Sequence, residues 1–213
     1  MNRSATAMVL VLLLAFGSFG CTRPNAKTGI VTQKSTRPTS TTLSVSEYFP
    51  KADGSKWEFE GSGNEFAAFT RTVVYSSGNR VQMTDNNGGT TVARVFQLEP
   101  NRVTLVYELP ESYTPVNLLS ENPVLDETIL KAPLAKGTLL KRGTQTWTLI
   151  SSQETVKTPA GVFQHCIVVE NKGPNGSVRE YYAPNTGLIK RTFDDPATKA
   201  NVTSSLKRYT QGP

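Results

Sequence analysis

Apolar and polar residues alternate in short runs along the chain from about residue 48 onward. Val, Thr, Tyr and Phe recur in these runs, and no helical period is sustained. This pattern is typical of β-strands, because successive side chains of a strand point to opposite faces of its sheet. The predicted strands are Ser55–Glu60, Glu65–Ser76, Arg80–Thr84, Thr91–Glu99, Arg102–Glu108, Thr144–Thr158, Gly161–Asn171, Ser177–Ala183, Gly187–Phe193 and Ala200–Arg208.

The breaks between these strands combine Pro, Asn and Gly, which supply the fixed or positive φ angles of tight turns. Because consecutive strands joined by such turns pair as hairpins, the order predicts an antiparallel meander. The turns are Ser77–Asn79, Asn86–Gly89, Pro100–Asn101, Thr158–Gly161, Gly173–Gly176 and Pro184–Gly187.

Alternation places several residues on common faces, and the opposite faces are only half polar. A strongly curved sheet with something inside it blurs the simple contrast between a core face and a solvent face. The predicted fold class is therefore all-β, with at most a short helix, as a curved antiparallel meander that forms a half-barrel or open barrel. The sets expected on one face each are Val92, Arg94, Phe96 and Leu98; Val103, Leu105 and Tyr107; and Phe163, His165, Ile167 and Val169.

Residues 111–140 interrupt the strand rhythm and are long for a loop in one domain. We expect a short helix or an irregular excursion there, with one edge strand near Thr128–Ala132. Such an insertion is hypothesised to cover the open side of the curved sheet.

The first 21 residues have the pattern of a secretory leader. Arg3 precedes an unbroken apolar run, Met8–Phe16, and small residues lead to Cys21. The run is too short to span a membrane as a helix. With a cysteine at the exit it resembles a bacterial lipoprotein signal, in which Cys21 becomes the lipid-modified (palmitate-carrying) first residue. An ordinary signal peptide with a nearby cysteine is the alternative, because Ser18 stands where an aliphatic residue is usual.

The predicted domain organisation is a signal peptide at 1–20, a flexible lipidated tether at 21–46, and one β domain at 47–210. The tether is rich in Thr and Ser and has basic but no acidic residues before Glu47. Such a segment buries too little apolar surface to offset its ordering entropy. A short ordered piece near Thr41–Val45, held against the domain, is the alternative.

The chain carries a formal net charge of +6, with 23 Lys and Arg against 17 Asp and Glu. These basic residues are scattered along strand-like segments, whereas a nucleic-acid binder clusters them on one face. We therefore expect no nucleic-acid partner, and only a weak attraction to anionic lipid or cell-wall polymers.

Residues with catalytic potential are few. His165 and Cys166 are neighbours in an apolar strand and so point to opposite faces, which excludes a nucleophile–base pair there. Neither a second histidine nor a cysteine cluster offers a metal site, and no G-x-S-x-G motif occurs. Asp194–Asp195 and Asn86–Gly89 are interpreted as turns. No catalytic residue, metal site or cofactor is therefore predicted, although a carboxylate pair formed in space stays open.

Three pieces of sequence together resemble uncharacterised bacterial lipoproteins and secreted domains, similar in outline to the LolA/LolB-like lipoprotein-carrier half-barrel. That resemblance implies a curved antiparallel sheet with an apolar groove for acyl chains, and it identifies no individual binding residue. The pieces are Tyr48–Pro50 with Gly54–Phe59, Val156–Phe163 followed by Cys166 and Val168, and Tyr181–Lys190.

The leading functional hypothesis is a non-enzymatic, extracytoplasmic protein of the cell envelope, anchored through Cys21 to the cell membrane or outer membrane. Its curved sheet is expected to bind a lipid or other apolar or amphipathic ligand, or a partner protein. The alternative is a structural or protein-interaction module of the envelope without a ligand cavity. A carboxylate-pair hydrolase is the third hypothesis.

Overall fold

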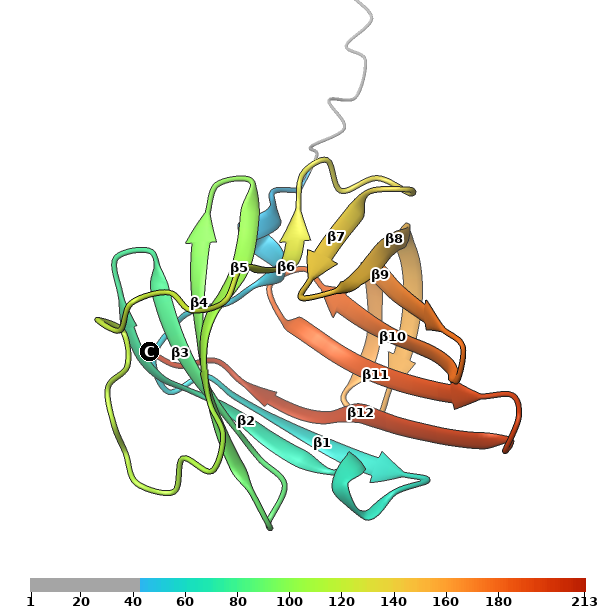
Figure 1. Cartoon of the computed structure of the whole chain (residues 1–213), viewed down its shortest axis with the longest axis horizontal. Coiled ribbons are helices and arrows are strands. Elements are labelled where there is room, and N and C mark those ends of the chain that lie inside the picture. Colours follow the sequence, from blue (N-terminus) through green and yellow to red (C-terminus); the bar gives the residue numbers. More distant parts are fainter. Residues whose placement is uncertain (1–42) are drawn as a thin grey trace, which may run out of the picture. The chain divides into compact units, whose positions relative to one another are not determined.

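The structure is a computed structural model that describes residues 43–213 (Figure 1). These residues form one sheet of twelve strands and two short 3-10 helices. The 3-10 helices are η1 (Val45–Tyr48) and η2 (Glu65–Ala67). The strands are β1 (Lys56–Ser62), β2 (Phe69–Ser77), β3 (Arg80–Asn86), β4 (Thr91–Glu99), β5 (Arg102–Leu109), β6 (Glu127–Lys131), β7 (Leu139–Arg142), β8 (Gln145–Thr158), β9 (Gly161–Gly173), β10 (Gly176–Ala183), β11 (Gly187–Asp195) and β12 (Ala200–Thr210).

All pairs in the sheet are antiparallel, and almost every strand pairs with its neighbours in sequence. The order is β6-β5-β4-β3-β2-β1-β12-β11-β10-β9-β8-β7, in which the pairing of β1 with β12 joins the two halves of the meander. The sheet curls until its two end strands, β6 and β7, lie side by side without a backbone ladder between them (Figure 1). The all-β class and the curved antiparallel meander are thus confirmed, in the form of a nearly closed barrel.

Two predictions of secondary structure differ from the structure, and a third is confirmed. Residues 65–67, expected to begin a strand, form η2, because the Asn64 side chain accepts a hydrogen bond from the Phe66 amide and caps a helical turn. The short strand β7 was not predicted, since four residues are too few to show alternation. The edge strand expected near Thr128–Ala132 is present as β6.

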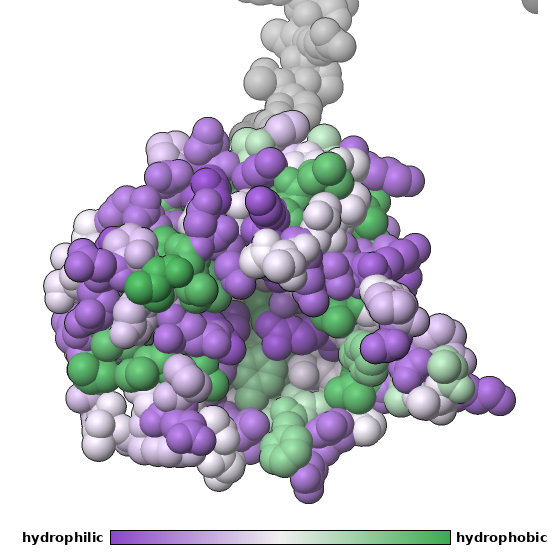
Figure 2. All heavy atoms as spheres, in the orientation of Figure 1, coloured by the Kyte–Doolittle hydropathy of each residue, from purple (hydrophilic) through white to green (hydrophobic). Residues whose placement is uncertain are grey.

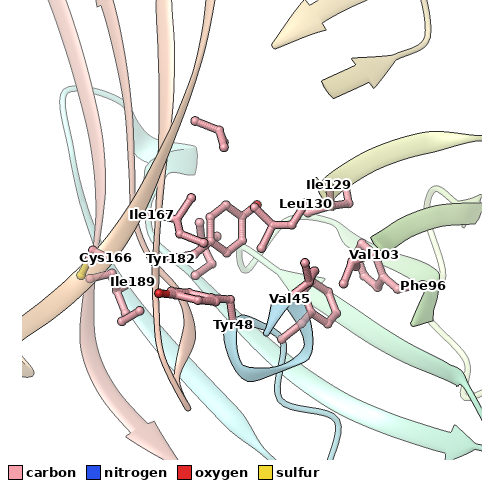
Figure 3. Close-up of a cluster of buried hydrophobic side chains, with 14 of the residues drawn as sticks. Val45, Tyr48, Phe96, Val103, Ile129, Leu130, Cys166, Ile167, Tyr182 and Ile189 are labelled. Atoms are coloured by element: carbon pink, nitrogen blue, oxygen red, sulfur yellow. The ribbon is translucent and has the colours of Figure 1, made fainter. Parts of the chain in front are cut away.

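The short helix η1 closes part of the barrel interior and belongs to its core. Val45, Tyr48 and Phe49 are all buried against apolar residues of the sheet. In Figure 3, Tyr48 points toward Ile189 and Cys166 on the β9–β11 side, while Val45 points toward the β4–β5 side. The Tyr48 hydroxyl donates to the carbonyl of His165 at 2.8 Å. Leu43 also packs against this core, which fits the alternative of an ordered piece near Thr41–Val45 held against the domain.

β-bulges change the faces that simple alternation assigned in two strands. A bulge between β4 and β5 pairs Val95 with Tyr107 and Phe96 with Leu105, so Tyr107 packs in a separate outer cluster while Leu105 stays in the inner core. His165 has a positive φ of 54° beside an irregular part of the β8–β9 pairing.

Tyr107 and His165 were therefore predicted on the wrong face of their strands. Each irregularity adds a residue, and an added residue shifts the alternation of faces by one. His165 is exposed, whereas Ile167 and Val169 are buried in the inner core. The face holding Arg94 and Phe96 is confirmed, since both line the barrel interior.

Residues 112–119 pack on the convex outer surface of the sheet. Leu118 is buried in the outer cluster with Ala93, Val95 and Val106 of β4 and β5. The hypothesis that this insertion covers the open, concave side was therefore wrong for these residues, whereas Leu125 and Leu134, later in the same insertion, pack against the inner core. Apolar residues on the outer face of β4 and β5 provide the surface that holds residues 112–119 there.

Gln82 of β3 fastens this segment to the sheet, and its replacement tests the attachment. Its amide Nε2 donates to the Val116 carbonyl at 2.8 Å, and its Oε1 accepts from the Leu118 amide at 2.7 Å. Gln82→Ala is expected to lower the free energy of unfolding by about 1–3 kcal/mol, because buried backbone groups lose their partners. Hydrogen exchange at the Leu118 amide should accelerate. Gln153→Ala, at an exposed position, is the control and should leave that amide unchanged.

No helix within residues 43–213 is long and apolar enough to cross a membrane. The predicted signal peptide, the lipidation site at Cys21 and nearly all of the expected tether lie outside the described residues.

Candidate functional site

A cavity of about 190 Å³ lies inside the barrel, where η1 and the inner apolar side chains leave space. Figure 2 shows this face of the molecule hollowed between the two halves of the sheet, with hydrophilic and hydrophobic surface inside the hollow. Arginine and carboxylate side chains make up much of its wall, and apolar side chains make up the rest. The lining residues are Phe49, Arg71, Arg94, Phe96, Leu105, Glu108, Glu127, Ile129, Arg142, Glu180, Tyr182 and Arg191.

One ion-pair network crosses strands β2 to β5. The register places Arg71 opposite Asp85 and Arg94 opposite Glu108, so each pair is formed by directly facing residues. Arg71 binds Asp85 through two parallel hydrogen bonds of 2.7 Å, and Arg94 joins Asp85 to Glu108 with bonds of 2.6 Å. Burial raises the pKa of Asp85, but the Arg71 and Arg94 charges outweigh burial and hold it below its usual range.

A second network lies on the opposite wall and centres on Glu180 of β10. Arg142 of β7 donates to Glu180 Oε2 at 2.8 Å, and Arg191 donates to Oε1 at 2.9 Å. The Tyr182 hydroxyl donates to Glu180 Oε2 at 2.8 Å. Burial opposes ionisation of Glu180, yet the Arg142 and Arg191 charges dominate and lower its pKa well below the usual range. Burial and then the Glu180 charge raise the pKa of Tyr182, so its phenol stays protonated.

The same Arg142 also closes the seam of the barrel. Its Nε and Nη2 atoms donate to the Thr128 and Ile129 carbonyls of β6, both at 3.1 Å. Its guanidinium lies 4.1 Å from the centroid of the Trp147 ring, a cation–π geometry. A side chain thus supplies across β6 and β7 the bonds that a backbone ladder provides elsewhere in the sheet.

Hydrogen-bond donors exceed acceptors in the two networks. A guanidinium carries five N–H donors, and within the described residues Arg71 Nη1, Arg94 Nη2 and Arg191 Nη1 make no hydrogen bond to the protein. Both oxygens of Glu180 are already engaged. The cavity therefore offers unused N–H groups to any oxygen-rich group that enters it.

An apolar rim adjoins these donors. A neighbouring pocket shares Arg94 and Arg191 with the cavity wall. Phe66, Phe69 and Val92 form its apolar part, and Asp85, Asn87 and Thr90 complete its lining. Phe66 is 58% exposed, which is unusual for a phenylalanine. Charged and apolar binding surfaces are thus contiguous.

The residues singled out in the sequence for possible chemistry lie away from this cavity. His165 is exposed and its Nδ1 is 2.9 Å from Gln153 Oε1, while Cys166 is buried and its pKa is raised to about 11 by burial. Asp195 caps the turn before β12 through bonds to Ala197 and Thr198, and Asn86–Gly89 forms the β3–β4 turn. Among residues 43–213, no cluster of His, Cys, Asp and Glu has the grouping of a metal site.

The cavity residues were not recognised as a site from the sequence, although a signal was present. Arg94 alternates with Val92 and Phe96, and Glu180 alternates with Val178 and Tyr182. A charged residue on an otherwise apolar strand face indicates either a buried ion pair or a polar interior. This sequence pattern does not identify the ion-pair partners of Arg94 and Glu180, because the pairing register of the strands brings together residues that are distant along the chain.

Two solved structures are similar to this chain. One is described as an exported protein with a YmcC-like fold from Bacteroides fragilis. It shares 17% sequence identity with this chain at a TM-score of 0.46, and the match covers 76% of this chain and 98% of that protein's chain. A protein described as a lipoprotein from Parabacteroides distasonis shares 18% identity at a TM-score of 0.44, over the same shares. No family model and no curated protein matches the sequence. The resemblance to the LolA/LolB-like carriers stays a prediction.

Proposed function

We propose that this protein is a non-enzymatic, extracytoplasmic envelope protein whose barrel holds an amphipathic ligand. The observation that carries the proposal is the interior cavity, in which unused guanidinium N–H groups of Arg71, Arg94 and Arg191 adjoin the apolar rim around Phe66. The polar end of the ligand would bind at the arginines, and its apolar part would lie along the rim. Hydrogen bonds to charged groups contribute about 1.5–3 kcal/mol each.

A purely apolar ligand fits this interior less well. The apolar part of the barrel is already filled by Val45, Tyr48 and Phe49 of the η1 region. The space that remains is lined by ionised side chains, whose burial under hydrocarbon without hydrogen bonds is costly. Of the apolar and amphipathic ligands expected from the sequence, the cavity therefore favours an amphipathic one.

The proposal is non-enzymatic because Asp85 and Glu180, the central carboxyls of the two ion-pair networks, are poorly suited to acid catalysis. A glycosidase-type general acid needs a raised pKa, whereas neighbouring arginines lower the pKa of Asp85 and of Glu180 against the effect of burial. The carboxylate-pair hydrolase therefore has no support from these two groups.

The proposed location is extracytoplasmic, at the cell membrane or the outer membrane, through a lipid on Cys21. Its basis is the leader pattern ending at Cys21. One acyl chain gives only marginal membrane binding, and two or more give stable anchoring. The intact mass of the mature protein tests this, since cleavage before Cys21 and added acyl mass are both expected.

Binding of a defined amphiphile tests ligand holding. We expect the full-length protein in mild detergent to bind dihexanoyl phosphatidylglycerol, and Arg191→Gln to weaken that binding about tenfold through loss of a charged donor, as measured by calorimetry. Arg208→Gln is the matched control, because Arg208 pairs with Glu58 in an exposed ion pair. Its affinity should equal that of the wild type.

Two results would contradict ligand holding or favour the alternative function. If neither native mass spectrometry nor calorimetry detects an amphiphile, ligand holding is wrong. If a reproducible protein partner also co-purifies with the wild type and with Arg191→Gln alike, the interaction module is the better description.

A further inference from the structure

One carboxylate in the cavity wall has no partner among the described residues. Glu127 of β6 lies opposite Leu105 in the β5–β6 register, and Leu105 is an inner-core residue, so Glu127 is on the inner face. It lines the cavity together with the arginines. Its Oε1 lies close to the turn after β7, since a Cβ built on Gly143 would be 3.5 Å from it. Within residues 43–213 its carboxylate makes no ion pair and no side-chain hydrogen bond.

The charges in and around the cavity balance only when Glu127 is counted. The cationic groups are Arg71, Arg94, Arg142 and Arg191, and the anionic groups are Asp85, Glu108, Glu127 and Glu180. All of these except Glu127 take part in the two ion-pair networks. A group that entered with a single negative charge would leave one charge uncompensated in a partly buried space, which costs free energy. A group carrying both charges would keep the balance.

Resting on the function proposed above, we propose that the cavity recognises a zwitterionic group, with an oxyanion and a primary ammonium in one compact unit. The oxyanion binds the unused N–H groups of Arg94 and Arg191. The ammonium binds the carboxylate of Glu127. Phosphoethanolamine has this chemistry, whether it is the headgroup of a lipid or a free molecule.

The test compares headgroups on equal acyl chains. Full-length protein in mild detergent is titrated with dihexanoyl phosphatidylethanolamine and with dihexanoyl phosphatidylglycerol, which lacks the ammonium. The wild type is expected to bind the ethanolamine lipid about tenfold more tightly, because a charge-assisted hydrogen bond is lost with the glycerol headgroup. Glu127→Gln should abolish this preference without lowering the affinity for phosphatidylglycerol, because the variant cavity has one positive charge in excess that an anionic headgroup compensates. Glu121→Gln, at an exposed position, should keep the preference.

The possible outcomes separate the hypotheses. Equal affinity for both lipids in the wild type overturns the zwitterion proposal and leaves the amphiphile-binding function standing. Absence of binding to both lipids and to free phosphoethanolamine overturns both proposals. Binding of free phosphoethanolamine that weakens in Glu127→Gln supports the recognition proposed here and assigns the ligand to a soluble source, whereas binding of only the lipid form assigns it to a membrane.

Discussion

Glu180→Gln is expected to lower the free energy of unfolding by about 3–5 kcal/mol, because it leaves Arg142 and Arg191 without their shared counter-charge. Glu180 is only 4% exposed and the Arg142 side chain only 9%, so water compensates the Arg142 charge poorly once the carboxylate is lost. Arg142 also holds the seam through Thr128 and Ile129, and the change should therefore loosen β6 against β7. Urea unfolding measures the first effect, and hydrogen exchange of the β6 amides measures the second.

The pH dependence of the free energy of unfolding is an independent measure of the contribution of Glu180. The pKa of Glu180 is lowered in the folded protein, so the unfolded chain binds its proton first as the pH falls. Its stabilisation is fully present above the ordinary carboxyl pKa of 4.5 and decreases as the pH falls below that value. The wild type should therefore lose stability more steeply in acid than Glu180→Gln. Some slope should remain in the variant, since the pKa of Asp85 is also lowered.

Glu58→Gln is the control for this experiment. Glu58 pairs with Arg208 on the surface, where solvent screens the interaction, and its replacement should leave urea unfolding unchanged. A Glu180→Gln variant as stable as the wild type would contradict the assignment of the network as the support of the seam.

Tyr48→Ala is expected to destabilise the protein by about 3–5 kcal/mol, the usual effect of removing a large aromatic side chain from a core. Tyr48 is 2% exposed, and its ring occupies the interior between η1 and the β9–β11 side of the barrel (Figure 3). Tyr48→Phe keeps the ring and removes only the hydrogen bond to the His165 carbonyl, so a loss of about 1 kcal/mol is expected. Denaturant unfolding of both variants separates packing from hydrogen bonding.

Tyr113→Ala serves as the surface comparison. Tyr113 is 63% exposed on the convex segment, and its loss should change stability by less than about 0.5 kcal/mol. If Tyr48→Ala were as mild as Tyr113→Ala, η1 would be a peripheral element and the packed domain would begin with β1.

The strands and turns could be predicted from local pattern because each depends on neighbouring residues. Alternation marks a strand wherever one side is more apolar than the other, and Pro, Asn and Gly mark the turns. The pattern failed where geometry is not local. A bulge moved Tyr107 to the outer cluster, and a positive φ at His165 displaced that residue from the inner face. The segment containing Leu118 joined the convex side because apolar residues of distant strands face it there.

What the sequence by itself determined is the all-β antiparallel character of the domain and the sequential order of its hairpins, together with the expectation of a leader that ends at Cys21. Only the tertiary structure decided that the sheet closes on itself and that Arg142 and Glu180 meet across its interior. Only the tertiary structure placed Glu127 in the cavity wall, where its carboxylate has no partner within residues 43–213. Periodicity along a chain reports the face of each strand, whereas curvature and register decide which faces meet, and these arise from the packing of the whole barrel.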